Sequence, residues 1–232
     1  MNYNLCKKIQ SEADNAIFSL NTILKKNEEF KNNFRDNLLF RLMRSGQFYE
    51  QEKKNKLLDY FQTWSNYFQQ MMFLKTALCC DPTFTSLFRR HLEEEYGHDK
   101  ILSQERNNQP PRNDAILEAI CNWFPSKIIS YTPHEQIILV HLCLEASSVI
   151  FHEYAISALD PNKQFSYLQL HQEADTSHEE MGNYLLEGLT EIHYRRLLDI
   201  QELSWNMIEA LMNRIAELSS DIITPIRAPY PQ

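Results

Sequence analysis

The sequence contains very little glycine: its 232 residues include only Gly46, Gly97, Gly182 and Gly188. So few glycines leave no material for a glycine-rich phosphate-binding loop or for a series of tight hairpins. Clusters of lysine and arginine are also missing, and the formal charge is −8 with a pI near 5.5. A chain without basic clusters cannot neutralise many phosphates. Nucleotide-binding folds, all-β folds and nucleic-acid partners are therefore disfavoured.

The sequence also lacks a signal peptide, a long apolar run and paired cysteines. Its N-terminus is polar and carries Glu12 and Asp14, which a signal peptide would not contain. The most apolar run, residues 137–151, is interrupted by His141 and Glu145 and is too short to cross a bilayer. Five scattered cysteines without a C-x-x-C pair are typical of reduced thiols. We therefore expect a cytoplasmic protein without a membrane partner.

Helical periodicity runs through almost the whole chain, and prolines or polar clusters separate the periodic segments. The expected helices cover residues 5–26, 33–45, 50–80, 84–106, 114–124, 132–159, 164–187 and 191–220. Residues 224–232 are rich in proline and are expected to form an extended tail. Because strand-like alternation is absent, the sequence predicts a single all-α domain over residues 1–232, with residues 1–26 as an N-terminal helix.

Seven of the eight histidines lie on three of these helices, and all of them except His134 belong to polar stripes that contain a carboxylate at helical spacing. In the helix at 84–106, Glu94 and Glu95 lie four and three residues before His98, so either one shares a face with it. The E-x-x-H spacing is the one that carboxylate-bridged metal sites in helical bundles use. An exposed charged surface explains the same run of three glutamates, and the choice between Glu94 and Glu95 stays open.

The helix at 132–159 carries a carboxylate in apolar surroundings. His141, Glu145, Ser148 and His152 form one polar stripe on a helix that is otherwise apolar nearly all round. A buried carboxylate must be paired or bound to a metal, because burying it alone costs several kcal/mol. A buried ion pair and a metal ligand are therefore both consistent with Glu145.

The helix at 164–187 presents His171, Asp175 and His178 at positions i, i+4 and i+7, on one face. Imidazole and carboxylate ligands without thiolate favour iron or manganese over structural zinc. The surrounding glutamates and glutamine also fit an exposed polar stripe. Any one stripe can arise by chance, but three of them on three helices indicate a shared metal site.

The order of these motifs resembles the haem-oxygenase-like diiron oxidases, which share a seven-to-eight-helix bundle with the TenA and PqqC proteins. The resemblance covers most of the chain, from Phe34–Gly46 through the aromatic segment at 50–80 to the last histidine motif. Some members carry a carboxylate where this chain has His91, so a further ligand there is left open. Carried over onto this sequence, the family's metal ligands correspond to Glu95, His98, Glu145, His171, Asp175 and His178.

The resemblance implies an enzyme that uses two Fe(II) ions and dioxygen, with the second iron often held weakly. Manganese in place of one iron stays open. His141 and His152 are then candidates for proton delivery or for orienting the metal ligands. The expected substrate is a small molecule, an amino acid, in a biosynthetic pathway. N-oxygenation and oxidative C–C cleavage to an alkene or nitrile both remain open, and a homodimer is common for this fold.

A substrate pocket is expected between the ligand helices and the aromatic segment at 50–80. Trp64, Tyr67, Phe68 and Met71 are its candidate lining residues, although such a stripe also fits an ordinary core.

Two other classes of function compete with the oxidase. A metal-free TenA-like hydrolase needs a cysteine nucleophile, and Cys143 or Cys121 would have to serve. A non-enzymatic helical interaction protein would use the three stripes as ion pairs only. A haem oxygenase needs a proximal histidine early in the chain, and the first histidine is His91.

Overall fold

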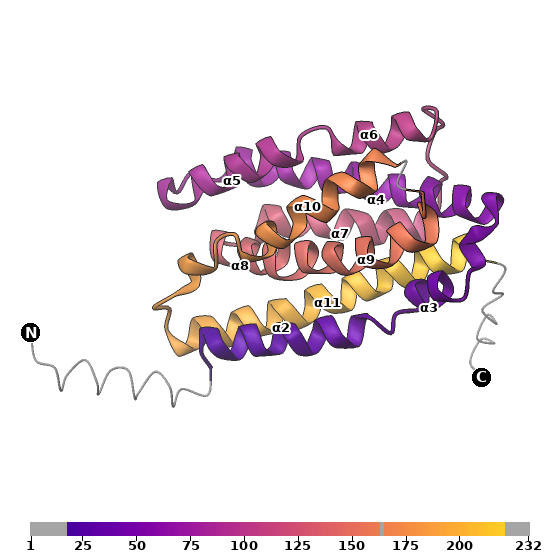
Figure 1. Ribbon diagram of the computed structural model, residues 1–232. Helices are drawn as coiled ribbons and strands as arrows, with labels where there is room; N and C mark the ends of the chain where they lie inside the picture. The colour runs from indigo at the N-terminus through magenta and orange to yellow at the C-terminus, as the bar shows by residue number, and fades with distance from the viewer. Residues whose placement is uncertain (1–17, 163–164, 221–232) are drawn as a thin grey trace, which may run out of the picture.

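The computed structural model describes residues 18–162 and 165–220, without the side chains of residues 171–177. The start of the expected N-terminal helix and the tail at 224–232 lie outside the described residues. Within them the chain is all-α, as predicted, and no residue is in a strand. The fold is a bundle of helices (Figure 1).

The helices of the described residues are more numerous than the seven to eight expected, because some expected helices are broken. Two short 3₁₀ turns cover Gln47–Tyr49 and Asn183–Leu186. The helices are α2 (Leu20–Phe34), α3 (Leu38–Arg44), α4 (Gln51–Leu78), α5 (Pro82–Glu95), α6 (His98–Glu105), α7 (Ala115–Ser130), α8 (Pro133–Ile137), a π-helical segment (Ile138–Glu145), α9 (Ala146–Leu159), α10 (Ser166–Glu180) and α11 (Glu191–Ser219).

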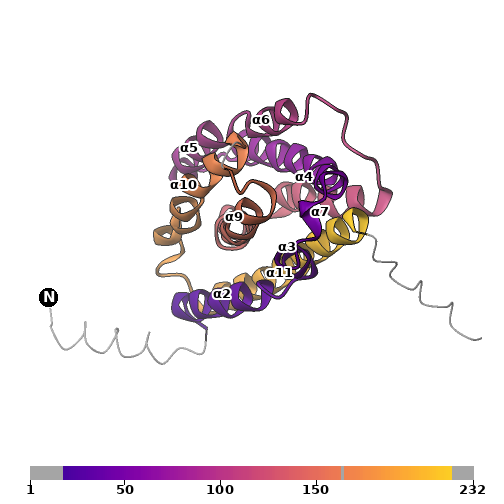
Figure 2. The same cartoon turned by 45° about the vertical axis from the view of Figure 1, so that its right-hand side comes forward.

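One continuous helix, residues 133–159, runs through the middle of the bundle. Figure 2 shows its last part, α9, enclosed by the other helices. Thr132 and Glu135 form a capping box at its start, and Pro133 takes the first helical position, as the sequence predicts. The helix is 27 residues long and apolar enough to cross a membrane, so the expectation that this region is too short does not hold. However, 78% of its most apolar stretch is buried inside the fold, as in a core helix.

The middle of this helix is wound as a π-helix over Ile138–Glu145, and all eight residues are buried. π-helical hydrogen bonds join residue i to i+5, and such segments are rare and frequent at functional sites. His141 and Glu145 both lie in this segment. The sequence predicted that His141 and Glu145, four residues apart, share a face with α-helical spacing. The π-helical winding changes that spacing at Glu145.

The helix expected over residues 84–106 is broken after Glu95, which corrects that prediction. Gly97 has a φ of 89°, a left-handed conformation that favours glycine, and α6 begins directly after it at His98. Glu95 therefore ends one helix and His98 starts the next. The two residues do not share one helical face, and their contact depends on the turn between them.

Further boundaries differ from the sequence prediction. The first expected helix does not end at residue 26, because α2 begins at Leu20 after the Ser19 N-cap and runs to Phe34. Pro125 does not close a helix at Phe124, because α7 continues through it to Ser130. Both residues are buried, so packing of α7 in the core outweighs the lost helical hydrogen bond. The helix expected over 164–187 ends at Glu180, and Gly182 with a φ of 91° leads into the 3₁₀ turn.

Aromatic side chains connect the central helix to the helices around it. Phe61 of α4 stacks on Phe151 of α9 with ring centroids 4.4 Å apart. Trp64 packs edge-on against Phe124 of α7 at 4.9 Å. Such contacts hold the helices in one register around the central one. They fix the position from which Glu145 faces α5 and α10.

Candidate metal centre

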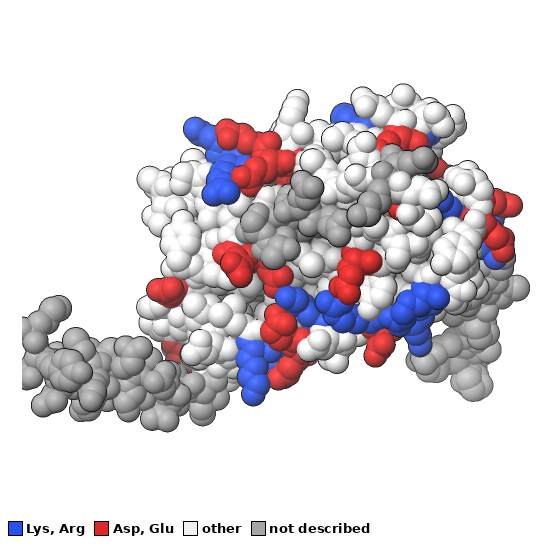
Figure 3. Space-filling view, viewed as in Figure 1, with Lys and Arg blue, Asp and Glu red and all other residues white. Residues whose placement is uncertain are grey.

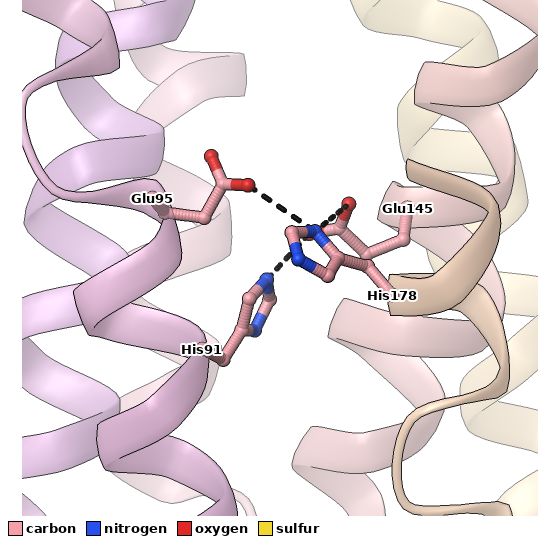
Figure 4. Close-up of side chains that lie close together, drawn as sticks. All are labelled: His91, Glu95, Glu145 and His178. Atoms are coloured by element: carbon pink, nitrogen blue, oxygen red, sulfur yellow. Dashed lines mark ion pairs between the residues drawn. The ribbon is translucent and has the colours of Figure 1, made fainter. Parts of the chain in front are cut away.

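Four buried side chains from three parts of the chain meet in the bundle. His91, Glu95, Glu145 and His178 each offer a ligand atom, and these atoms lie within 4.8 Å of one another. Each residue is at most 3% exposed. Figure 4 shows His91 and Glu95 on one side, with Glu145 and His178 opposite them. We call these residues the four-residue cluster.

Each element brings its residue in for a local reason. His91 and Glu95 lie four residues apart on α5, so they share a face one turn apart. Glu145 is the last residue of the π-helical segment. His178 lies in the last turn of α10, whose first N–H groups, at Ser166 and Tyr167, donate to the Glu105 carboxylate at the end of α6.

The atoms of the cluster approach closely without forming ordinary hydrogen bonds. His91 Nε2 lies 2.9 Å from Glu145 Oε1, yet neither atom has a partner in hydrogen-bond geometry among the described residues. His178 Nδ1 is 3.2 Å from Glu95 Oε1 and has no such partner in the described part of the chain either. Buried polar atoms without partners are costly. Nitrogen and oxygen atoms that converge in this way fit a divalent cation between them, and two imidazoles with two carboxylates suit iron, manganese or zinc.

The charges of the cluster support the same interpretation. Burial opposes the charged form of His178, but Glu145 and Glu95 outweigh it and raise the pKa of His178 to about 10. Burial raises the pKa of Glu145, while His178 counteracts this effect. Without a metal, the two carboxylates therefore depend on a proton held by His178. A divalent cation supplies that positive charge directly.

A buried lysine stands behind His91. Lys75 of α4 is fully buried, and its Nζ lies 2.8 Å from His91 Nδ1 and 4.9 Å from the centroid of the Phe88 ring. Burial lowers the pKa of Lys75 to about 7, against the opposing charges of Glu145 and Glu95. Burial and the nearby Lys75 hold the pKa of His91 well below its usual range. Lys75 thus contacts the far ring nitrogen of His91, and Nε2 faces the cluster.

The residues predicted on α5 and α6 take different places. Glu95 lies in the cluster, whereas Glu94 lies outside it, 2.9 Å from His178 Nε2. His98 adjoins the cluster, with its Nδ1 2.9 Å from the second oxygen of Glu95. His91 is a member of the cluster that the predicted ligand set did not include. Two sequence signals pointed to it: its position two turns before His98 and its spacing of four residues from Glu95.

The residues predicted on α10 are only partly visible. His178 lies in the cluster, whereas the side chains of His171 and Asp175 lie outside the described residues. The helix itself spans both positions, from Ser166 to Glu180. Their place as ligands therefore stays a prediction.

His141 and His152, the predicted proton-delivery residues, lie on opposite sides of Glu145 in the sequence and have separate partners. His141 is fully buried, its ring centroid lies 4.7 Å from that of His91, and its Nδ1 donates to the backbone oxygen of His178. His152 Nδ1 donates to the backbone oxygen of Ser148. His141 thus contacts two members of the cluster, His91 and His178.

A cavity adjoins the cluster on the side of Glu95, His98 and Glu145. Five aromatic side chains line it: Phe61, Trp64, Phe68, Phe151 and Tyr167. Of the predicted pocket residues, Trp64 and Phe68 are among its lining residues and Tyr67 and Met71 are not. Met71 is fully buried and Tyr67 packs against the core from its edge.

The two candidate cysteine nucleophiles are poorly suited to react. Both Cys121 and Cys143 are fully buried. Burial raises the pKa of Cys121 to about 12 and raises that of Cys143 well above its ordinary value. A thiol that stays protonated is a weak nucleophile. The geometry therefore gives a cysteine hydrolase no support.

Comparison with known proteins places the chain in a family without assigning an activity. No protein-family model matches the chain. No solved structure matches it either. The uncharacterized protein RP592 of Rickettsia prowazekii is 36% identical over 194 residues, which cover 84% of this chain and 93% of the rickettsial protein. The chain therefore belongs to the same family as RP592.

Proposed function

We propose that this protein is an oxygen-dependent non-haem oxidoreductase that holds iron at the four-residue cluster. The observation that carries the proposal is the convergence of four buried ligand atoms within 4.8 Å, without hydrogen-bond geometry between His91 Nε2 and Glu145 Oε1. A second iron would draw on His98 and on the α10 positions His171 and Asp175. Bound ferrous iron would supply the electrons and the open coordination positions that dioxygen chemistry needs.

The remaining residues of the site have supporting tasks in this proposal. Lys75 and Glu94 each face the far ring nitrogen of a cluster histidine and orient that ring. The aromatic walls of the cavity keep bulk water away from Glu95 and Glu145. His141 connects the π-helical segment to the backbone of His178 and is the candidate for moving a proton at the cluster.

The substrate in this proposal is a small molecule, an amino acid with a sizeable apolar or aromatic side chain. The aromatic lining of the cavity next to Glu95, His98 and Glu145 supports it, because such walls favour apolar groups. N-oxygenation and oxidative C–C cleavage to an alkene or nitrile are the two reaction classes. The haem-oxygenase-like fold, cytoplasmic location and homodimer form part of the same proposal, and the all-α bundle around one buried helix supports the first of these.

Anaerobic titration with ferrous iron tests the proposal. We expect uptake approaching two irons per chain and, on exposure to oxygen, a visible absorption band that is absent in His178→Ala. His193→Ala is the matched control, because His193 is exposed at the start of α11 and far from the cluster in sequence. Absence of iron binding, with candidate amino acids present, would contradict the proposal and favour the interaction protein.

A further inference from the structure

The two ring nitrogens of His178 face different environments. Nδ1 points into the four-residue cluster, 3.2 Å from Glu95 Oε1 and 3.6 Å from Glu145 Oε2 (Figure 4). Nε2 lies on the other side of the ring, 2.9 Å from Glu94 Oε2. Two adjacent glutamates of α5 therefore contact opposite edges of the same imidazole.

Glu94 is itself held in place from the surface. Its Oε1 accepts from Arg90 Nε at 2.8 Å, one turn earlier on α5, while Oε2 faces His178. The exposed fraction of the side chains falls from 67% at Arg90 to 36% at Glu94 and 2% at His178. Figure 3 shows basic and acidic side chains gathered on the surface over α5. The three residues thus form a chain of contacts from solvent to the cluster.

A carboxylate at this place fixes the tautomer of the histidine. An ionised carboxylate only accepts hydrogen bonds, so the ring nitrogen that faces it must carry a proton. The guanidinium of Arg90 donates to Oε1 of Glu94, which leaves Oε2 facing Nε2 of His178 and placed to accept its proton. Nε2 of His178 then keeps its proton, and Nδ1 is the nitrogen that is left to bind a cation.

We infer that Glu94 is a positioning residue that commits His178 to bind metal through Nδ1, and that only its neighbour Glu95 is a ligand. This inference rests on the proposed metal site. It also assigns separate roles to the two glutamates between which the sequence could not choose. Glu94 acts through the ring of His178 and does not touch the metal.

The backbone around His178 is anchored independently of Glu94. The carbonyl of His178 accepts from His141 Nδ1 at 3.0 Å, and the next residue, Glu179, pairs with Lys31 of α2 at 2.7 Å. Removing the Glu94 carboxylate therefore releases the ring while α10 stays attached. This separation makes the inference testable by substitution.

Cobalt(II) and zinc(II) are suitable probes, since both bind nitrogen and oxygen ligands and neither needs oxygen. Cobalt affinity and the visible cobalt spectrum would be measured in wild type, Glu94→Ala and Glu94→Gln. Glu93→Ala is the control, because Glu93 is the exposed neighbour on the same turn. Nitrogen-15 NMR of the zinc-loaded wild type would report which ring nitrogen of His178 carries the proton.

We expect Glu94→Ala to weaken cobalt binding about 10- to 100-fold and to change the cobalt spectrum. Glu94→Gln should restore most of the affinity, because its amide oxygen accepts the same Nε2 proton. Glu93→Ala should bind as wild type does. The NMR experiment should show the proton on Nε2.

A wild-type affinity and spectrum in Glu94→Ala would overturn the inference while leaving the metal site intact. A proton on Nδ1 in the zinc-loaded protein would overturn it too, even if Glu94→Ala failed to fold. Wild-type protein that binds neither metal would defeat the proposed function itself, and the inference with it.

Discussion

The two histidines of the cluster face the same carboxylate, but a buried lysine lies behind one ring and a partly exposed glutamate lies behind the other. His91 and His178 both approach Glu145, at 2.9 and 3.6 Å. Behind His91 stands Lys75, which is fully buried, whereas behind His178 stands Glu94, which is partly exposed and held by Arg90. The pKa of His91 is held well below its usual range by burial and Lys75, and that of His178 is raised to about 10.

The two pKa values differ because burial and Lys75 lower that of His91, whereas Glu145 and Glu95 outweigh burial and raise that of His178. Burial acts on both imidazoles, but only His178 has carboxylates on both edges of its ring. The metal-free cluster therefore combines one neutral and one protonated histidine. A cation entering the cluster needs to displace a proton from His178, whereas the lowered pKa of His91 leaves that imidazole neutral.

The largest expected effect comes from removing the carboxylate that both histidines share. Glu145→Gln keeps the shape of the side chain but removes its charge, so we expect cobalt affinity to fall by more than about 100-fold. This loss exceeds the loss of about 10- to 100-fold that is typical when a residue that only orients a metal ligand is removed. Competition with a chelator measures the change. Glu153→Gln is the control on the same helix, since Glu153 pairs with Arg35 at the surface. Unchanged affinity in Glu145→Gln would show that the cluster is an ion-pair network.

The next effect concerns pH and separates Lys75 from His178 in the metal-free protein. The folded pKa of His178, about 10, lies above its unfolded value, so its stabilisation is complete below pH 6.5 and is lost as pH rises toward 10. The folded pKa of Lys75, about 7, lies below its unfolded value of 10.5, so its contribution makes stability rise between pH 7 and 10.5. The two slopes oppose one another.

Lys75→Met removes only one of these slopes. We expect the free energy of unfolding of the variant to fall relative to wild type as pH rises from 7 to 9.5, by up to about 1.4 kcal/mol per pH unit. Urea unfolding at several pH values, in the presence of a chelator, measures the difference. Parallel pH profiles for variant and wild type would contradict the lowered pKa of Lys75 and the pH slope assigned to it.

The same variant should weaken metal binding without weakening the fold at pH 7. Replacing a buried ionisable group with an apolar one of similar size is often neutral or stabilising. However, His91 Nδ1 loses its partner, so we expect cobalt affinity to fall about tenfold. Lys56→Met, on the same helix and paired with Glu52 at the surface, should retain wild-type affinity. Equal affinity in Lys75→Met would mean that His91 needs no orienting partner.

Part of this arrangement could be predicted from the sequence. The prolines and the apolar periodicity predicted an all-α chain, which the structure confirms, and an apolar helix around Glu145 indicated its burial. The break at Gly97 had a visible signal in the glycine itself, but helical periodicity continues on both sides of it. The π-helical segment had no sequence signal. A change from α- to π-helical winding shifts the apolar face of an amphipathic helix, but a helix that is apolar all round has no distinct face to shift.

The partners of the cluster were harder to find than its members. Lys75 and His91 are 16 residues apart on different helices, so only the packing of α4 against α5 brings them together. Glu94 and Glu95 are adjacent and chemically identical, and only the place where α5 ends decides which one faces inward. Spacing along one helix predicts which residues share a face. It does not predict which residue of another helix stands behind them.

The smallest expected effect comes from Arg90, the most exposed residue of the contacts that lead from the surface to His178. Arg90 is two-thirds exposed and contacts Glu94, which in turn contacts His178. Because water screens such a pair, Arg90→Ala should change cobalt affinity by less than about threefold, measured in the same competition assay. At high salt the difference should disappear. A loss as large as that of Lys75→Met would mean that the exposed side of the cluster controls His178 as strongly as the buried side controls His91, and the contrast between the two histidines would no longer hold.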